Sequence, residues 1–141
     1  MMYDSIESQI IAHEGERLKL YKCGAGKLTI GVGRNIEDNG IRKDESELMF
    51  RNDLNEAVTD LINFLGPSFW EAISEGRRRA LTDLRFNLGP NRFRGFARMI
   101  RACRYGDWKM AAYELTDSLW WRQVQDSRKT LLYNQLLTGE P

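Results

Sequence analysis

The sequence predicts an α+β fold in which a small β-hairpin lobe and a larger helical lobe are joined by one long helix. Alternating apolar and polar residues over 17–32 indicate the hairpin, and apolar residues at three- and four-residue spacing over 43–65 indicate the long helix. Beyond it, helical periodicity is broken only by short glycine- and proline-containing stops. We expect the 141 residues to form a single domain, with the hairpin lobe at about 13–45 and the helical lobe at about 66–141.

The first predicted element is a short helix at 4–14, which we assign to the helical lobe. Asp4, followed three residues later by Glu7, has the spacing of a capping box, and Gly15 ends the helix. Its apolar stripe consists of Ile6, Ile10 and His13, with Ile11 beside it.

The hairpin is predicted from two alternating runs on either side of a glycine-rich turn. Residues 17–20 form the first run, Cys23-Gly24-Ala25-Gly26 the turn, and residues 27–32 the second run. In the second run Leu28, Ile30 and Val32 share one face and Thr29 lies on the other. Three reactive groups, Glu14, Cys23 and Thr29, are therefore expected at an edge rather than in the core. Residues 35–40 read as a turn.

The long helix is predicted over 43–65, where acidic residues load the first turn and Gly66-Pro67 ends the pattern. At this length it is a rod of ~33 Å, long enough to link two lobes. The remaining helices are expected at 69–73, 75–88, 93–104, 108–115, a segment opening at Trp120, and 126–137. Trp108, Trp120 and Trp121 have helical spacing, which favours core positions over sugar-stacking ones.

Composition is that of an ordinary globular chain, with 42% apolar residues, 29% charged residues and a net charge of +1. Such a balance gives no strong global field for nucleic acid or membrane. The arginines are nevertheless concentrated in the second half: Arg77, Arg78, Arg79, Arg85, Arg92, Arg94, Arg98, Arg101 and Arg104. They form either a solvated helix face or a surface for an anionic polymer such as peptidoglycan or nucleic acid.

Cysteine usage and the first residues indicate a chain made in a reducing cytosol. The two cysteines, Cys23 and Cys103, are expected to be free thiols, because a small secreted scaffold would use more. We expect no signal peptide, since residues 1–6 lack a basic and an apolar region, and no apolar run reaches the ~18 residues of a membrane span.

Several other chemistries lack a supporting pattern, and we expect no metal and no cofactor. Gly31-Val32-Gly33 is too short for a dinucleotide fingerprint, and one histidine with two cysteines makes no zinc site. A protease dyad of His13 and Cys23 lacks an orienting partner.

The motif Glu14-Gly15-x-Arg17-Leu18-x-x-Tyr21, followed by Cys23 and by Thr29-Ile30-Gly31-x-Gly33, resembles the catalytic segment of the phage T4-type lysozymes, the endolysins of glycoside hydrolase family 24. Phe86-Asn87-Leu88-Gly89, Gly95-Phe96 and Trp120 also follow the order of that family, so the resemblance covers nearly the whole chain. The best-known member has aspartate where this chain has Cys23, and histidine where it has Arg34.

The resemblance implies a lysozyme-like fold and an inverting muramidase that cleaves the β-1,4 bond between N-acetylmuramic acid and N-acetylglucosamine. Glu14, at a helix C-terminus that disfavours an ionised carboxylate, would be the general acid. Cys23 and Thr29 would hold the attacking water, and Phe96 and Gln123 would line the saccharide cleft. Arg34 could pair with an acid on the long helix.

The resemblance also implies a biological setting. A monomer made in the host cytoplasm would be delivered by a holin to peptidoglycan in the periplasm or cell wall, for phage-type lysis, with no nucleic acid or membrane partner. Two other readings stay open: an inactive cell-wall-binding or virion structural module whose activity was lost through Cys23, and a basic nucleic-acid binder. For Glu14 the competing structural interpretation is an ion pair with Arg17, and for Cys23 and Thr29 it is a turn residue and a strand former.

Overall fold

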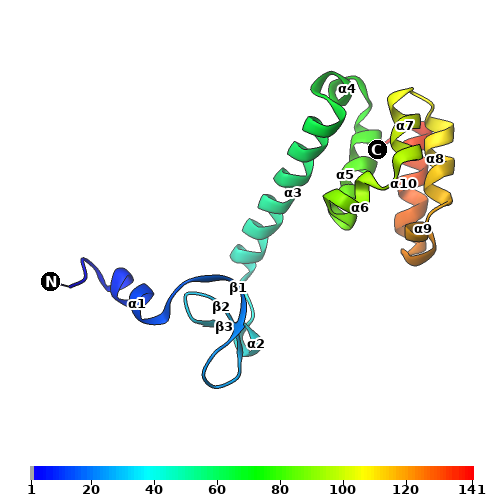
Figure 1. Ribbon diagram of the computed structural model, residues 1–141. Coiled ribbons are helices and arrows are strands. Elements are labelled where there is room, and N and C mark those ends of the chain that lie inside the picture. The colour runs from blue at the N-terminus through cyan, green and yellow to red at the C-terminus, as the bar shows by residue number, and fades with distance from the viewer. Residues whose placement is uncertain (1) are drawn as a thin grey trace. The chain divides into compact units, whose positions relative to one another are not determined.

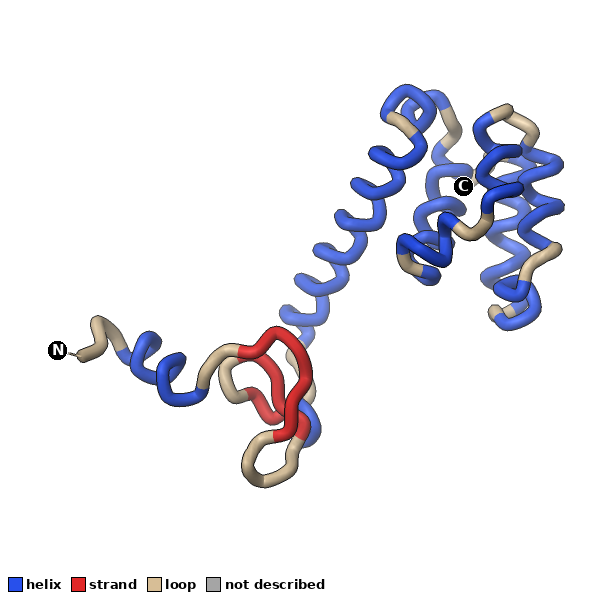
Figure 2. The backbone as a smooth tube through the Cα atoms, in the orientation of Figure 1, coloured by secondary structure: helices blue, strands red, loops and turns tan. Residues whose placement is uncertain are grey.

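The computed structural model describes residues 2–141 and divides the chain into two compact units, one ending at Leu48 and the other spanning Met49–Pro141. The first unit holds a short helix and a small antiparallel sheet, and the second is helical (Figures 1 and 2). This confirms the predicted α+β class. Helix α3 (Lys43–Leu65) belongs to both units, and its bounds are those that the sequence predicts.

Helix α1 (Ile6–Glu14) starts later than predicted, because a different residue caps it. The Ser5 hydroxyl accepts a hydrogen bond from the Ser8 backbone N–H, and the Ser8 hydroxyl accepts one from the Ser5 N–H, both at 3.1 Å. The capping box is thus Ser5 and Ser8, and the assignment to Asp4 and Glu7 is wrong. A hydroxyl serves both positions because its oxygen is a good acceptor on a short side chain.

The sheet has three antiparallel strands in the order β1-β2-β3, with β1 at Arg17–Lys22, β2 at Leu28–Gly31 and β3 at Arg34–Asn35. The predicted hairpin is its first two strands. Residues 36–39, predicted as turn, instead form the one-turn helix α2 (Ile36–Asn39), because the Asn35 side chain accepts from the Asp38 N–H at 3.0 Å and caps it.

Thr29 is buried, with 3% of its surface exposed, whereas the sequence placed it at an edge outside the core. It lies on the central strand, where its Cα is opposite both Tyr21 of β1 and Asn35 of β3. Leu28 and Ile30 on the other face are only half-buried, and Val32 is exposed. The third strand, which the alternation pattern did not reveal, accounts for this difference.

The second unit continues from the end of α3 through seven shorter helices. They are α4 (Pro67–Ala72), α5 (Glu75–Leu88), α6 (Pro90–Arg94), α7 (Ala97–Arg104), α8 (Trp108–Thr116), α9 (Leu119–Gln123) and α10 (Asp126–Thr138). Helix α10 packs against α5 and α8, and α8 also packs against α7 (Figure 1). Phe93, Leu61, Leu81, Leu84, Met99, Leu115, Leu132 and Leu136 are almost fully enclosed in this core.

The single helix predicted at 93–104 is in fact two helices, α6 and α7. Pro90 occupies the first turn of α6, where its missing N–H costs nothing. Phe96 then leaves the helical conformation, with φ −80° and ψ 51°, before α7 begins. Gly95-Phe96 is therefore a break between the two helices.

The tryptophans and cysteines take the positions expected for them. Trp120 is buried and its indole N–H donates to Asn87 Oδ1 at 2.8 Å, while Trp108 and Trp121 pack at the margin of the core. Cys103 is buried and Cys23 is half-buried, and both are free thiols. Within the described residues no disulfide links Cys23 to Cys103, as predicted.

Three arginines close the ends of helices other than their own. Arg77 donates to the carbonyls of Leu136 and Leu137 at the end of α10, at 3.0 and 3.1 Å. Arg78 donates to the carbonyls of Trp70, Glu71 and Ile73 at the end of α4. Arg104 donates to those of Phe64 and Leu65 at the end of α3. Terminal carbonyls have no partner inside their own helix, so these bonds satisfy them.

Within residues 2–141, no helix is both long enough and apolar enough to cross a membrane. The same residues contain no group of three or more histidine, cysteine or acidic side chains arranged to hold a metal ion.

Candidate active site

Glu14 is the last residue of α1, and its carboxylate lies against the glycine turn between β2 and β3. A Cβ atom built on Gly33 would stand 2.6 Å from Glu14 Oε2, so only a glycine leaves room for the carboxylate. Gly33 also has φ +67°, which side-chain-bearing residues rarely adopt. The end of the helix and the turn therefore meet at the acid.

Glu14 is exposed and has no cationic partner in its own unit. Among residues 2–48, no lysine or arginine lies within ion-pair distance of its carboxylate. Arg17, the partner that a structural role would require, instead places its guanidinium 4.4 Å from the Tyr21 ring centre. The carboxylate is thus available to a ligand.

Cys23 follows β1 directly, and the strand pairing brings it beside Thr29. Tyr21 is opposite Thr29 and Lys22 is opposite Leu28, so the chain leaving Lys22 enters the turn next to β2. Hydrogen bonds from the backbone N–H groups of Lys27 and Ala25 lower the pKa of the Cys23 thiol, the Thr29 hydroxyl lowers it further, and partial burial opposes them. The turn therefore favours a thiolate, as converging backbone N–H groups favour anions generally.

The Thr29 hydroxyl donates to the Lys27 carbonyl at 2.8 Å. A hydroxyl has one proton and two lone pairs, so with this bond made its oxygen is an acceptor. If Cys23 is a thiolate, its sulfur is a second possible acceptor for the Thr29 hydroxyl proton. In either state the Thr29 oxygen keeps lone pairs that can accept a hydrogen bond.

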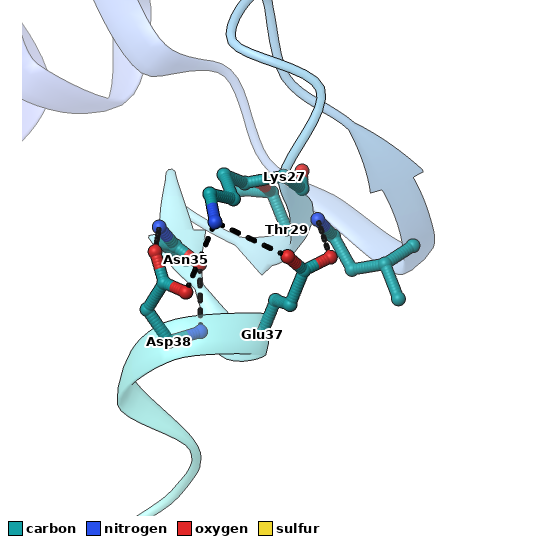
Figure 3. Close-up of polar contacts among 6 residues, drawn as sticks. Lys27, Thr29, Asn35, Glu37 and Asp38 are labelled. Carbon is teal, nitrogen blue, oxygen red and sulfur yellow. Dashed lines mark hydrogen bonds and ion pairs between the residues drawn. The ribbon is translucent and has the colours of Figure 1, made fainter.

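A polar cluster fixes the strand that carries Thr29 (Figure 3). Lys27 Nζ lies 3.4 Å from a Glu37 carboxylate oxygen and 3.3 Å from Asp38 Oδ1. Glu37 also accepts from the Leu28 N–H at 3.4 Å, and Asn35 Nδ2 donates to Asp38 at 2.9 Å. Each exposed contact is worth little alone. Together they tie the start of β2 and the end of β3 to α2, on either side of the Thr29–Asn35 pair.

Arg34 pairs with Glu45 in the first turns of α3, which confirms the expected acid on the long helix. Glu45 also accepts from the Arg42 N–H at 2.7 Å. The Arg34 hydrogen bond and then the Arg42 backbone N–H lower the pKa of Glu45 to about 2. This pair joins β3 to α3.

The two predicted saccharide-binding residues differ in their surroundings. Phe96 is half-buried and lines a pocket of about 510 Å³ in the second unit, together with Arg98, Glu114, Asp117 and Trp120. Gln123 is exposed at the end of α9 and is absent from the lining of that pocket. Arg98 is one of the arginines that the sequence offered to an anionic polymer, whereas Glu114 and Asp117 were missed, because no local pattern places them beside Phe96.

A helix ending in a free carboxylate, followed by a three-stranded sheet and a helical unit, defines a lysozyme-like protein. The phage lysozyme family matches residues 11–134, which include Glu14, Cys23, Thr29, Phe96 and Gln123. The chain belongs to that family.

Its relatives include a phage spike protein, a probable lysozyme and an endolysin. The chain is 30% identical to the pre-baseplate central spike protein Gp5 of Enterobacteria phage T4, over 96% of this chain and 28% of that protein. It is 25% identical to a probable T4-type lysozyme 2 of Dictyostelium discoideum, over 84% of this chain and 86% of the relative. It is 31% identical to an endolysin of Acyrthosiphon pisum secondary endosymbiont phage 1, over 72% and 68%. The chain thus spans just over a quarter of the spike protein's length.

Proposed function

We propose that this protein is a muramidase that hydrolyses the β-1,4 bond between N-acetylmuramic acid and N-acetylglucosamine in peptidoglycan. One observation carries the proposal: Glu14 has no cationic partner in its unit and lies against a glycine in the same small unit that holds Cys23 beside Thr29. Glycoside hydrolysis needs an acid for the leaving oxygen and a group for the opposite face of the sugar, and these residues supply both.

In the proposed reaction the protonated Glu14 carboxyl donates its proton to the glycosidic oxygen as the bond to the anomeric carbon breaks. A water held by Cys23 and Thr29 attacks that carbon from the other face, which inverts its configuration. The Thr29 oxygen accepts one water hydrogen and orients the water. The Cys23 thiolate accepts the proton that the water releases, so Glu14 ends ionised and Cys23 ends as a thiol.

The lowered pKa of Cys23 supports the thiol in the place of a carboxylate, because it makes the thiolate more accessible than in an ordinary cysteine. A neutral thiol is a weak acceptor, whereas a thiolate carries the full negative charge that a general base needs. Backbone N–H groups of the turn supply the stabilisation, so no separate cationic side chain is required.

The second candidate is a wall-binding or virion structural module with little or no turnover. Its support is the 30% identity to the central spike protein over 96% of this chain, together with Cys23 at a position where an aspartate is known. In the muramidase reading the biological role is host lysis by a monomer that is made in the cytoplasm and reaches the wall with the help of a holin.

Release of dye from labelled peptidoglycan separates the two candidates. We expect the wild-type protein to release dye and Glu14→Gln to lose ~10²-fold or more of that rate, because a general acid contributes about that much. Binding of the wall without release by the wild-type protein would support the structural module. If Glu14→Gln kept more than a tenth of the wild-type rate, Glu14 would not be the general acid.

A further inference from the structure

A row of arginines crosses the surface of α7 in the second unit. Arg98, Arg101 and Arg104 recur every third residue, ~4.5 Å apart along the helix axis, and all three are exposed. The opposite side of α7 is buried, with Met99, Ile100, Ala102 and Cys103 in the core. We name the three arginines, with Arg94 and Tyr105, the α7 basic surface.

Part of this surface is hollowed into a recess of about 480 Å³. Arg94, Arg101 and Arg104 line it with Phe64 and Tyr105, and no acidic side chain of residues 49–141 is part of the lining. The nearest acid in sequence, Asp107, uses its carboxylate to accept from the Met110 N–H as the cap of α8. All charged side chains that line the recess are therefore positive.

The arginines of the surface differ in how much of their charge is already used. Arg94 shares Asp60 with the buried Arg85, at 2.7 Å in each case, so that group of three keeps one net positive charge. Arg104 donates to the carbonyls at the end of α3. Arg101, like Arg98, has no ion-pair partner among residues 49–141. Arg101 thus has a whole guanidinium to offer a ligand.

The surface is continuous with the Phe96 pocket. Ala97 lines both hollows, Arg98 lines the pocket, and Arg101 lines the recess. A polymer strand with sugars in the pocket would pass along α7, where successive arginines meet negatively charged groups projecting from it. Arginine suits carboxylates because its planar fork makes two parallel hydrogen bonds.

The same geometry disfavours nucleic acid. Single strands bind proteins by stacking bases on open aromatic rings as well as by charge. Here the guanidinium groups of Arg94 and Arg104 cover Phe64, at 4.5 and 5.4 Å from its ring centre, which leaves Tyr105 as the one open ring of the recess in the described second unit.

From these observations we propose that the α7 basic surface is a binding site, outside the Phe96 pocket, for the carboxylates that hang from peptidoglycan strands. The inference rests on the proposed function for the identity of the polymer. It predicts tight, salt-sensitive binding of charged wall strands and weak binding of neutralised ones, since exposed charges are screened beyond ~10 Å at 0.1 M salt.

The test measures binding to purified peptidoglycan by co-sedimentation, in a Glu14→Gln background so that nothing is cleaved. Wall material with its carboxylates converted to amides is compared with untreated material. Arg101→Gln is compared with Arg79→Gln, a matched loss of one exposed arginine that is 3.1 Å from Glu75 on α5. Thermal melting checks that both variants are folded.

We expect amidation to weaken binding at least tenfold, and Arg101→Gln to weaken it about threefold to fivefold, because an exposed ion pair is worth up to ~1 kcal/mol. Arg79→Gln should bind as the background does. Equal losses in both variants, or no effect of amidation, would overturn the site even if the wild-type protein releases dye. If the wild-type protein releases no dye but binding depends on charge and on Arg101, the binding site would stand and the proposed muramidase activity would be wrong. Equally tight, Arg101-dependent binding of single-stranded DNA would show that the surface is a nucleic-acid site instead.

Discussion

The Glu14 carboxylate lies directly against Gly33: a Cβ at position 33 would lie 2.6 Å from Glu14 Oε2 and 3.0 Å from its carboxyl carbon. The position of the Glu14 carboxylate thus depends on the absence of a Cβ atom at position 33. Because the carboxyl is the end of a flexible side chain, added bulk at 33 moves the acid rather than the backbone.

We expect Gly33→Ala to lower the rate of peptidoglycan hydrolysis about tenfold or more, since an acid displaced by about 1 Å loses its alignment with the leaving oxygen. The measurement is dye release per folded molecule. Gly40→Ala is the matched control, with a similar φ of +61° and nothing within 4 Å of the added carbon. Equal rate losses in the two variants would trace the effect to backbone strain alone.

Cys23 should make the enzyme sensitive to thiol alkylation. Iodoacetamide reacts with thiolates, and the pKa of Cys23 is lowered, whereas burial raises the pKa of Cys103 to about 12. We expect inactivation with one modified residue by mass spectrometry, in the wild type and in Cys103→Ala alike. Full activity after complete modification of Cys23 would show that the thiol has no part in the chemistry.

Substitution at the same position tests the role as base. Cys23→Asp should keep substantial activity, because a carboxylate accepts a proton from water at nearly the same place, and Cys23→Ala should lose more. Dye release as a function of pH distinguishes the acceptors: the thiolate enzyme should gain activity over a higher pH range than the aspartate variant. A Cys23→Ala enzyme as fast as the wild type would leave Thr29 to position the water without it.

The Arg34–Glu45 pair should contribute stability that depends on acid pH. The pKa of Glu45 is about 2 in the folded protein and near its ordinary value of 4.5 when unfolded. A depressed folded pKa gives stability that is present above about 4.5 and is lost as the pH falls toward about 2. The melting temperature of Glu45→Gln should therefore lie below that of the wild type at pH 6, and the two should converge near pH 2. A constant difference at all pH values would contradict the pair.

Gly76 should be intolerant of any side chain. A Cβ there would lie 2.2 Å from the Glu140 carbonyl oxygen and 2.4 Å from that of Gly139, and backbone atoms give way at a cost. We expect Gly76→Ala to lower the free energy of unfolding by about 2 kcal/mol, as overpacking does. Chemical denaturation measures it, with Gly24→Ala, which meets nothing within 4 Å, as the control.

The sequence was a good guide to elements with strong local signals and a poor one to contacts between them. Gly66-Pro67 fixed the end of α3, and the glycine framing located the hairpin. Ser5 and Ser8 were missed because Asp4 and Glu7 have the same spacing and glutamate is the more familiar partner in a capping box. Thr29 was placed at an edge because a two-residue third strand carries no periodicity. Contacts such as Gly33 with Glu14 depend on segments that only tertiary structure brings together.

The arginines that close the helices bear on how the second unit unfolds. Arg77 and Arg78, at the start of α5, hold the last carbonyls of α10 and α4, and Arg104 of α7 holds those of α3. Unfolding either donor helix, α5 or α7, would also break the terminal hydrogen bonds of a neighbouring helix. Partial unfolding therefore costs more free energy than the loss of one helix alone. The second unit should accordingly unfold as a single cooperative block, in which the most protected amides of α3, α5, α7 and α10 report one common free energy of opening by hydrogen exchange.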